Sequence, residues 1–393
     1  MDWNHPHIHI ARGAAALAAA MGVGRFVYAP ILPLMTSQAG LTPTAGSALA
    51  TANYVGYLAG ALAGVAAPRV IRTTAAWRAA IIVVVVSLAL MPLTHTVISW
   101  LVIRAVAGFA SAILFLIAVD WMLDHAQGRS AQSPGWGFGG IGLGIALSGL
   151  VVLALPVAGW RASWWASSAL AAAMGAIAWH MRGAGHRPAA ATLEGTGRRR
   201  WLLVLLACYS LEGVGYIVAG TFLVAAIGQM SPGRLGNGAW TLVGLAAVPS
   251  AAVWATASAR WSRPALLTVA LLVQAGGIAA PALIDGTAPA LIGAVSFGGT
   301  FVGVSTMALA AGRELGFRGA VAVLTAGYSV GQILGPLVVT PLLHDGFRHA
   351  LLAAAAVVAG SAGMAAWLRL GCRQLSPPPR GADRLRAATL PAR

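Results

Sequence analysis

Three ionisable side chains stand inside long apolar stretches of this sequence, namely Arg25, Arg104 and Glu212. A charged side chain at the centre of a bilayer costs at least about 2.5–3.5 kcal/mol on insertion scales, so such residues usually face a wet cavity or a partner. A carboxylate that exchanges a proton beside an arginine can bias a conformational equilibrium. We therefore predict that Glu212 binds a proton and that Arg25 faces it across a shared cavity.

Each of these residues also has a structural interpretation. Arg25 could cap backbone carbonyl groups within its own half of the molecule, and Glu212 could make a fixed structural contact. Arg104 lies about 9 Å from the outer end of its segment at ~1.5 Å per residue, so its side chain could instead snorkel to the surface.

Polar and aromatic side chains at similar depth are candidates for solute binding. Asn53 and Tyr57 share one helical face, and Tyr328 and Gln332 share another. Such pairs suit hydrogen bonding and stacking to a small organic solute, although interhelical hydrogen bonding is a competing explanation. The predicted substrate cavity comprises Arg25, Tyr28, Asn53, Tyr57, Arg104, Tyr216, Tyr328 and Gln332.

Two prolines follow Arg25 in its segment. Pro30 and Pro33 each lack a backbone donor and clash with the carbonyl four residues earlier. The sequence therefore predicts a bend that frees carbonyl oxygens near Phe26 and Ala29, either as part of a cavity or as a purely structural feature.

Composition places these residues in a membrane protein. The 393 residues are 59% hydrophobic and only 9% charged, whereas soluble domains have about 25% charged residues. All 25 basic residues are Arg, so a P-loop motif, which needs Lys, is excluded. The net charge of +16 resides in short loops and the tail, which argues against nucleic-acid binding.

Apolar stretches long enough to cross a bilayer recur twelve times. An N-terminus inside the cell puts 20 Arg on the cytoplasmic side and 3 outside, so the positive-inside rule predicts cytoplasmic termini. The predicted spans are 11–36, 44–68, 78–95, 98–123, 135–157, 162–181, 201–229, 236–258, 265–284, 288–312, 318–343 and 347–370. The predicted organisation is a tail (1–10), a six-helix bundle (11–181), a central loop (182–200), a second bundle (201–370) and a tail (371–393).

The two halves resemble each other in sequence. Short motifs recur at nearly constant spacing, which favours two homologous six-helix bundles. The matches at an offset of 191 are Gly22 and Gly24 with Gly213 and Gly215, and Arg72 with Arg263. At an offset of 187, Gly140, Gly144 and Ser148 match Gly327, Gly331 and Gly335, and we interpret these rows as close-packing ridges.

These features resemble the major facilitator superfamily. The segments GVGRFVYAPILPLM at 22–35 and ANYVGYLAG at 52–60 are similar to its YbfB/YjiJ branch, and RAVAG at 104–108 is similar to a superfamily motif. The resemblance implies a cavity bordered by spans 1 and 7, and a gating loop that contains Gly64 and Arg72. Pro68 and Ile71 replace the Asp and second Gly of that loop, so a carboxylate-centred gate is not expected.

We therefore predict an all-α, twelve-span secondary transporter that moves a small organic solute by alternating access, coupled to protons. The alternative is a passive channel or a membrane sensor without coupled transport. The expected partners are the solute, protons and the lipid bilayer, without nucleic acid, and a monomer is expected. We expect the plasma membrane, or the inner membrane of a Gram-negative bacterium. No enzyme activity, cofactor or metal is expected. We interpret His5, His7 and His9 as a histidine-rich N-terminal segment and not as a metal site.

Overall fold

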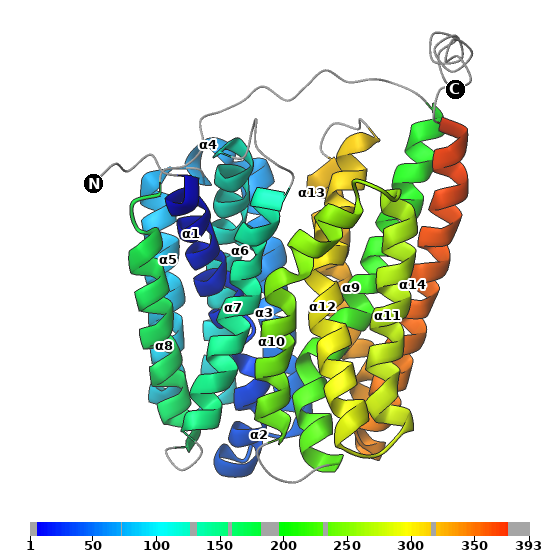
Figure 1. The fold of residues 1–393 in the computed structure, drawn as a ribbon. Helices are drawn as coiled ribbons and strands as arrows, with labels where there is room; N and C mark the ends of the chain where they lie inside the picture. The colour runs from blue at the N-terminus through cyan, green and yellow to red at the C-terminus, as the bar shows by residue number, and fades with distance from the viewer. Residues whose placement is uncertain are drawn as a thin grey trace, which may run out of the picture.

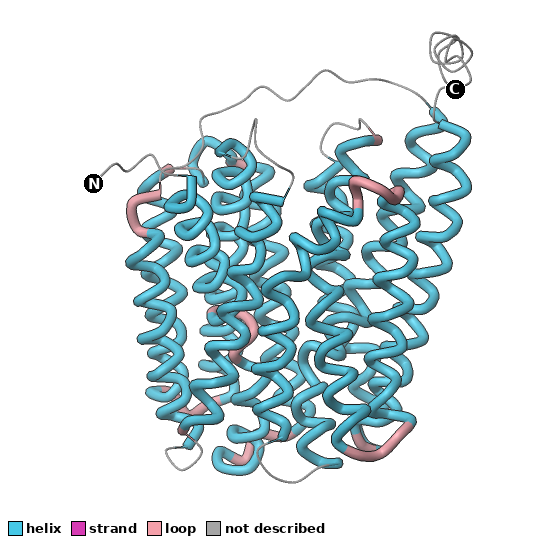
Figure 2. The backbone as a smooth tube through the Cα atoms, in the orientation of Figure 1, coloured by secondary structure: helices cyan, strands magenta, loops and turns pink. Residues whose placement is uncertain are grey.

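The computed structural model describes residues 6–71, 73–125, 132–155, 159–181, 196–230, 235–315 and 320–375. In these ranges the regular secondary structure is entirely helical (Figure 2). Ten of the described helices are long and apolar enough to cross a membrane. Helices α3 (Pro43–Ala66) and α8 (Gly159–Ala178) have spanning length but are not among those ten. The predicted count of twelve spans therefore depends on these two.

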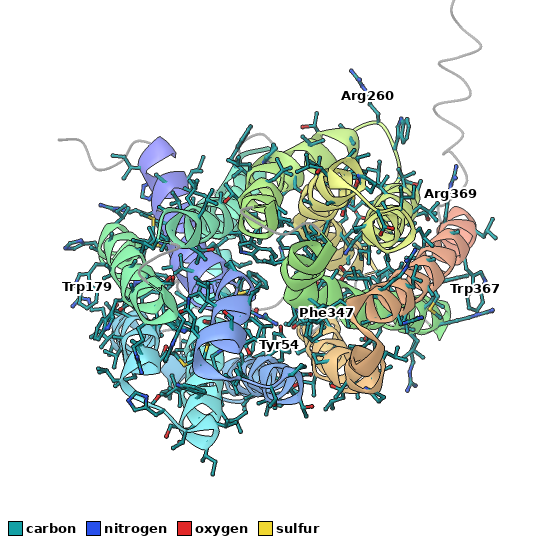
Figure 3. The ribbon with its side chains drawn as sticks, turned by 90° about the horizontal axis from the view of Figure 1, so that it is seen from below. Tyr54, Trp179, Arg260, Phe347, Trp367 and Arg369 are labelled. Atoms are coloured by element: carbon teal, nitrogen blue, oxygen red, sulfur yellow. The ribbon has the colours of Figure 1, made fainter. Side chains whose placement is uncertain are left out.

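The helices form two groups that lie side by side (Figure 3). The first contains α1 (Pro6–Leu17), the π-helix η1 (Ala18–Val23), α2 (Tyr28–Ala39), α3, α4 (Pro68–Ile71), α5 (Thr74–Leu90), the 3-10 helix η2 (Met91–Leu93), α6 (Val97–His125), α7 (Gln132–Ala154) and α8. The second contains α9 (Thr196–Met230), α10 (Leu235–Ala257), α11 (Arg263–Leu283), α12 (Thr287–Glu314), α13 (Ala320–Val339), the 3-10 helix η3 (Thr340–Asp345) and α14 (Phe347–Leu375). We call these groups the N-half and the C-half.

The two ends of the bundle differ in charge. Helix α1 begins and α14 ends at the upper end in Figure 1, as an even number of crossings requires. The described arginines near helix ends on this arginine-rich side are Arg12, Arg69, Arg78, Arg198, Arg199, Arg200, Arg260, Arg263, Arg313, Arg369 and Arg373. Those at the opposite end are Arg161 and Arg348. Most of the central loop and the C-terminal tail lies outside the described ranges.

Glycine rows bring helices together in the same way in both halves. In the N-half, Gly140 and Gly144 of α7 pack directly against the backbone of α1 and η1. In the C-half, Gly331 and Gly335 of α13 pack directly against the backbone of α9. The repeated motif of the sequence therefore corresponds to a repeated helix contact, and its close-packing interpretation is confirmed.

Helices α7 and α10 join the two halves through a second set of small residues. A Cβ added at Gly139 or Gly142 would collide with the backbone at Val248, and one added at Gly244 would collide with the backbone at Ala146. Small residues let helix backbones approach closely inside a membrane, where the hydrophobic effect does not drive helix association.

Helix α3 shows how tightly these contacts constrain the sequence. A Cβ added at Gly56 would collide with the backbone carbonyl of Ala105 on α6. We expect Gly56→Ala to lower the melting temperature of the purified protein, because overpacking a tight contact costs about 1–3 kcal/mol. Gly363→Ala on α14 is the matched control, since nothing lies within 4 Å of its added Cβ. The control should leave the melting temperature unchanged or raise it, since Ala favours helix; equal effects of the two changes would contradict this packing.

Candidate functional site

A central cavity lies between the two halves. It contains about 590 Å³ not filled by atoms, part of it open to solvent, and is lined by residues of both halves. Of its 17 lining residues, eight are Phe or Tyr, and Arg25 is the one charged residue among them. The aromatic members are Phe26, Tyr57, Phe115, Phe138, Tyr209, Tyr216, Phe301 and Tyr328. The cavity is thus an aromatic chamber with a single cation in its wall.

Arg25 links the halves across this cavity. Its side chain is only 2% exposed, and its Nη2 donates a hydrogen bond of 2.6 Å to Oε1 of Gln332 on α13. The guanidinium carbon lies 4.2 Å from the ring centre of Tyr57 and 5.0 Å from that of Tyr54. The buried Nε has no hydrogen-bond partner in the described structure. The side chain therefore contacts the other half instead of capping carbonyl groups in its own.

The C-half contributes a wall of stacked rings. Tyr209 and Tyr328 stack with their ring centres 4.3 Å apart and an angle of 16° between the planes. Tyr216 stacks on Phe301 at 5.4 Å and 25°, and on Tyr328 at 5.8 Å and 30°. These rings from α9, α12 and α13 form a continuous aromatic wall beside the cavity, which suits contact with an aromatic ligand.

Glu212 lies behind this wall. It is fully buried, and its Oε1 accepts a 3.3 Å hydrogen bond from Nε2 of Gln274 on α11. It is close enough to Tyr209 and Tyr328 to interact with both electrostatically, yet it does not line the cavity. The predicted contact between Glu212 and Arg25 is not formed in this structure, because each side chain bonds a different partner.

The path of the chain around Arg25 depends on Arg104. After η1 the chain makes a turn at 24–27 before α2 begins, and Figure 2 shows this turn as a loop segment inside the bundle. Pro30 cannot donate to the Phe26 carbonyl, but the N–H of Ala29 does so at 3.2 Å. The carbonyl oxygens left for other partners are therefore those of Gly24 and Arg25, and not the predicted one at Phe26. Arg104 Nη1 and Nη2 donate to the carbonyl oxygens of Gly24 and Arg25 at 3.3 and 3.1 Å. Because Arg104 is 1% exposed, it does not snorkel.

A second cavity leads from the centre toward the arginine-rich end. It encloses about 950 Å³, part of it open to solvent, and Arg263 and Arg313 are among its lining residues. Phe138, Thr306 and Leu309 line both cavities, so the two adjoin.

On the side of the cavity away from the arginine-rich end, the two halves contact each other through hydrogen bonds. Tyr54 hydrogen bonds to Thr221 at 3.0 Å, and Ser47 to Thr340 at 3.0 Å. Tyr54 lies at the junction of the two helix groups in Figure 3. The described structure thus has a central chamber that adjoins a cavity at the arginine-rich end and is flanked by contacts between the halves on the other side.

Comparison with known proteins agrees with this architecture. Residues 17–368 match the family described as "Uncharacterised MFS-type transporter YbfB". The chain belongs to this family of major facilitator superfamily transporters. A crystal structure of a mutant of the nucleoside transporter NupG has a similar fold, with a TM-score of 0.69 at 11% identity over 93% of this chain and 100% of that one. None of the curated proteins matches this chain in sequence.

The predicted cavity of this transporter divides into two layers. Arg25, Tyr57, Tyr216, Tyr328 and Gln332 line the central cavity.

The other predicted cavity residues lie one layer behind. Asn53 Nδ2 donates to the Arg104 carbonyl at 2.9 Å, and Tyr28 Oη donates to the Gly46 carbonyl at 2.8 Å. In this conformation Tyr28, Asn53 and Arg104 connect helices. For Asn53 this agrees with the competing interpretation of the polar pairs.

The remaining predicted residues have other surroundings. Gly64 of α3 faces the side chain of Leu116, whereas Arg72 lies outside the described residues. The side chain of Asp120, which the sequence places at the arginine-rich end, is also outside the described part.

Sequence reasoning missed several cavity residues. Tyr209 precedes Tyr216 by seven residues and so shares its helical face, a signal that was available in the sequence. Phe301 and Ser305 of α12 share a face by the same rule, but the predicted span 288–312 contains no ionisable residue that would have marked it. Only the packing of α12 against the cavity identifies that face.

Proposed function

We propose that this transporter moves a small organic solute across the membrane by alternating access, coupled to protons. The observation that carries the proposal is the central cavity, because it lies between the two halves and adjoins a second cavity at one end. Rocking of one half against the other around such a site would expose it alternately to each side.

The charge difference between the ends supports an orientation. We place the arginine-rich end in the cytoplasm, as the positive-inside rule indicates for short loops. The described conformation would then be open toward the cytoplasm. The expected location is the plasma membrane, which is the inner membrane if the source is a Gram-negative bacterium, and we expect the protein to act as a monomer.

Glu212 supports the proton-coupled form of this function. It is the one carboxylate buried at mid-membrane depth among the described residues, and its Oε2 has no hydrogen-bond partner there. Tyr209 and Tyr328 lie beside Glu212 and also line the cavity, so a change in its protonation would reach the solute site through them. Coupling in this arrangement is indirect, whereas the sequence suggested a direct contact with Arg25.

The alternatives are a passive channel and a membrane sensor. A channel needs an open route to both sides, and the bonds from Tyr54 to Thr221 and from Ser47 to Thr340 occupy the opposite end. A sensor would bind solute without flux. Saturable uptake that responds to an imposed pH gradient would separate the proposed function from both.

A reversible cross-link tests alternating access directly. The hydroxyl oxygens of Ser47 and Thr340 are 3.0 Å apart, so Ser47→Cys and Thr340→Cys should form a disulfide in a Cys372→Ser background. We expect oxidation of the double variant to block proteoliposome uptake of a solute selected by thermal stabilisation of the purified protein, and reduction to restore uptake. The two single variants are the controls, and undiminished uptake by the oxidised double variant would contradict the mechanism.

A further inference from the structure

We propose that the central cavity selects a planar aromatic carboxylate, an inference that rests on the transport function proposed above. The first observation is the unbalanced charge of Arg25. Neither cavity has an acidic residue among its described lining, and Glu212 bonds to Gln274 behind the aromatic wall. A buried cation is costly unless it is paired, so a ligand carboxylate would supply the missing partner.

The second observation is the geometry of the guanidinium. In arginine, Nε–H and one N–H of Nη2 point in the same direction and form an edge that matches the two oxygens of a carboxylate. In this structure Nη2 donates to Oε1 of Gln332, while Nε has no hydrogen-bond partner. A carboxylate can take both donors of this edge if it displaces the amide oxygen of Gln332 and the Arg25 side chain turns its buried Nε toward the cavity.

The third observation is the shape and chemistry of the surrounding walls. The rings of Tyr209 and Tyr328 lie within 16° of parallel, and Tyr216 lies within 25° of Phe301. An aromatic wall favours an aromatic ligand over a saturated one, because ring pairs gain from offset-stacked or edge-to-face contact beyond the area they bury.

Other ligand classes fit less well. An aromatic cavity can attract an organic cation, but Arg25 already lies 4.2 Å from the centre of the Tyr57 ring and would repel it. A neutral apolar ligand would leave the buried guanidinium without a charged partner. At the arginine-rich end, Arg263 and Arg313 line the adjoining cavity, and although Arg263 pairs with Glu314, the charge there favours the approach of anions.

Binding in this way would also act on the conformation. The Arg25–Gln332 bond joins the N-half to the C-half at the centre of the molecule. A carboxylate that replaces Gln332 breaks this bond, and the ligand then takes over the link between Arg25 and the rings of the C-half. Occupancy is thereby coupled to the contacts that must change during alternating access.

The test compares four ring compounds on the purified full-length protein by isothermal titration calorimetry. They are benzoate, its neutral isostere benzamide, the cation benzylamine and the saturated cyclohexanecarboxylate. We expect benzoate to bind at least about tenfold tighter than benzamide, because a charge-assisted bidentate contact is stronger than a neutral one. Cyclohexanecarboxylate should bind less tightly than benzoate, and benzylamine should not bind.

Variants assign the effect to one side chain. Arg25→Gln should weaken benzoate binding by at least about tenfold and remove the preference over benzamide. Arg260→Gln removes the same charge from an exposed site that points away from the bundle in Figure 3, and should leave both affinities unchanged. If Arg25→Gln does not fold, the comparison of benzoate with benzamide on the unaltered protein decides the matter alone.

The outcomes separate this inference from the proposed function. Absence of benzoate binding, equal binding of benzoate and benzamide, or preference for benzylamine would overturn the assignment of an aromatic carboxylate. Saturable proton-dependent flux of a neutral or cationic compound would do the same while upholding transport. Benzoate binding that depends on Arg25 but produces no flux in proteoliposomes would uphold the site and overturn the transport function.

Discussion

Replacement of Glu212 by Gln is expected to abolish solute accumulation driven by a proton gradient. The amide has nearly the shape of the protonated carboxyl group but cannot release a proton. The deprotonated state of the coupling cycle is therefore lost. Exchange of solute between the two sides, which needs no net proton movement, should continue. The measurement is uptake into proteoliposomes with and without an imposed pH gradient, together with counterflow at equal pH.

The pH dependence provides a second readout for the same variant. Uptake by the unaltered transporter should change with pH as Glu212 titrates, and uptake by Glu212→Gln should not. Asp285→Asn removes an exposed carboxylate between α11 and α12 and should leave the pH profile unchanged. Gradient-driven accumulation and an unaltered pH profile in Glu212→Gln would exclude this carboxylate as the proton site.

Arg104→Leu is expected to destabilise the protein strongly. The guanidinium donates to the carbonyl groups of Gly24 and Arg25. Because of the turn at 24–27, these carbonyls do not accept the regular helical hydrogen bond. Leaving a buried polar group without its partner costs about 1–3 kcal/mol, so two orphaned carbonyls cost on the order of 2–6 kcal/mol. We expect a lower melting temperature in detergent and a smaller yield of monodisperse protein.

The control for this prediction is an arginine without such contacts to span 1. Arg161 lies at the opposite end, where its guanidinium is exposed and near His95. The control variant is Arg161→Leu. Its melting temperature should stay close to that of the unaltered protein. If Arg104→Leu were as stable as Arg161→Leu, the carbonyl contacts of Arg104 would not support the turn that positions Arg25.

The two mid-membrane arginines show where local sequence stops being informative. Both are buried in apolar helical segments, and both were predicted to face the substrate cavity. Arg25 lines it, whereas Arg104 turns toward the backbone of span 1. The difference arises from the neighbour that each meets: the break in span 1 offers Arg104 two free carbonyl oxygens, and a break of this kind is satisfied by residues distant in sequence.

Glu212 shows the same limit in another form. Its one-turn spacing from Tyr216 places both on one side of α9, and Tyr216 does line the cavity. Glu212 lies behind the wall because Gln274 of α11 binds its carboxylate and the stacked pair of Tyr209 and Tyr328 lies beside it. Periodicity gives the direction of a side chain to within a helical face, but it does not say which residues of other helices cover that face.

Composition and spacing alone determined that this is a helical membrane protein with repeated halves, and they located Arg25, Tyr57, Tyr216, Tyr328 and Gln332. These properties follow from local rules, because the length of an apolar run, the 3.6-residue period and the asymmetry of arginine are all contained in the chain. Only the tertiary structure decided that Arg25 bonds across the halves to Gln332, that Arg104 donates to the carbonyls of the turn in span 1, and that Tyr54 bonds across the halves to Thr221. Each of these depends on how close two helices come, and that distance is set by packing between glycines and side chains far apart in sequence.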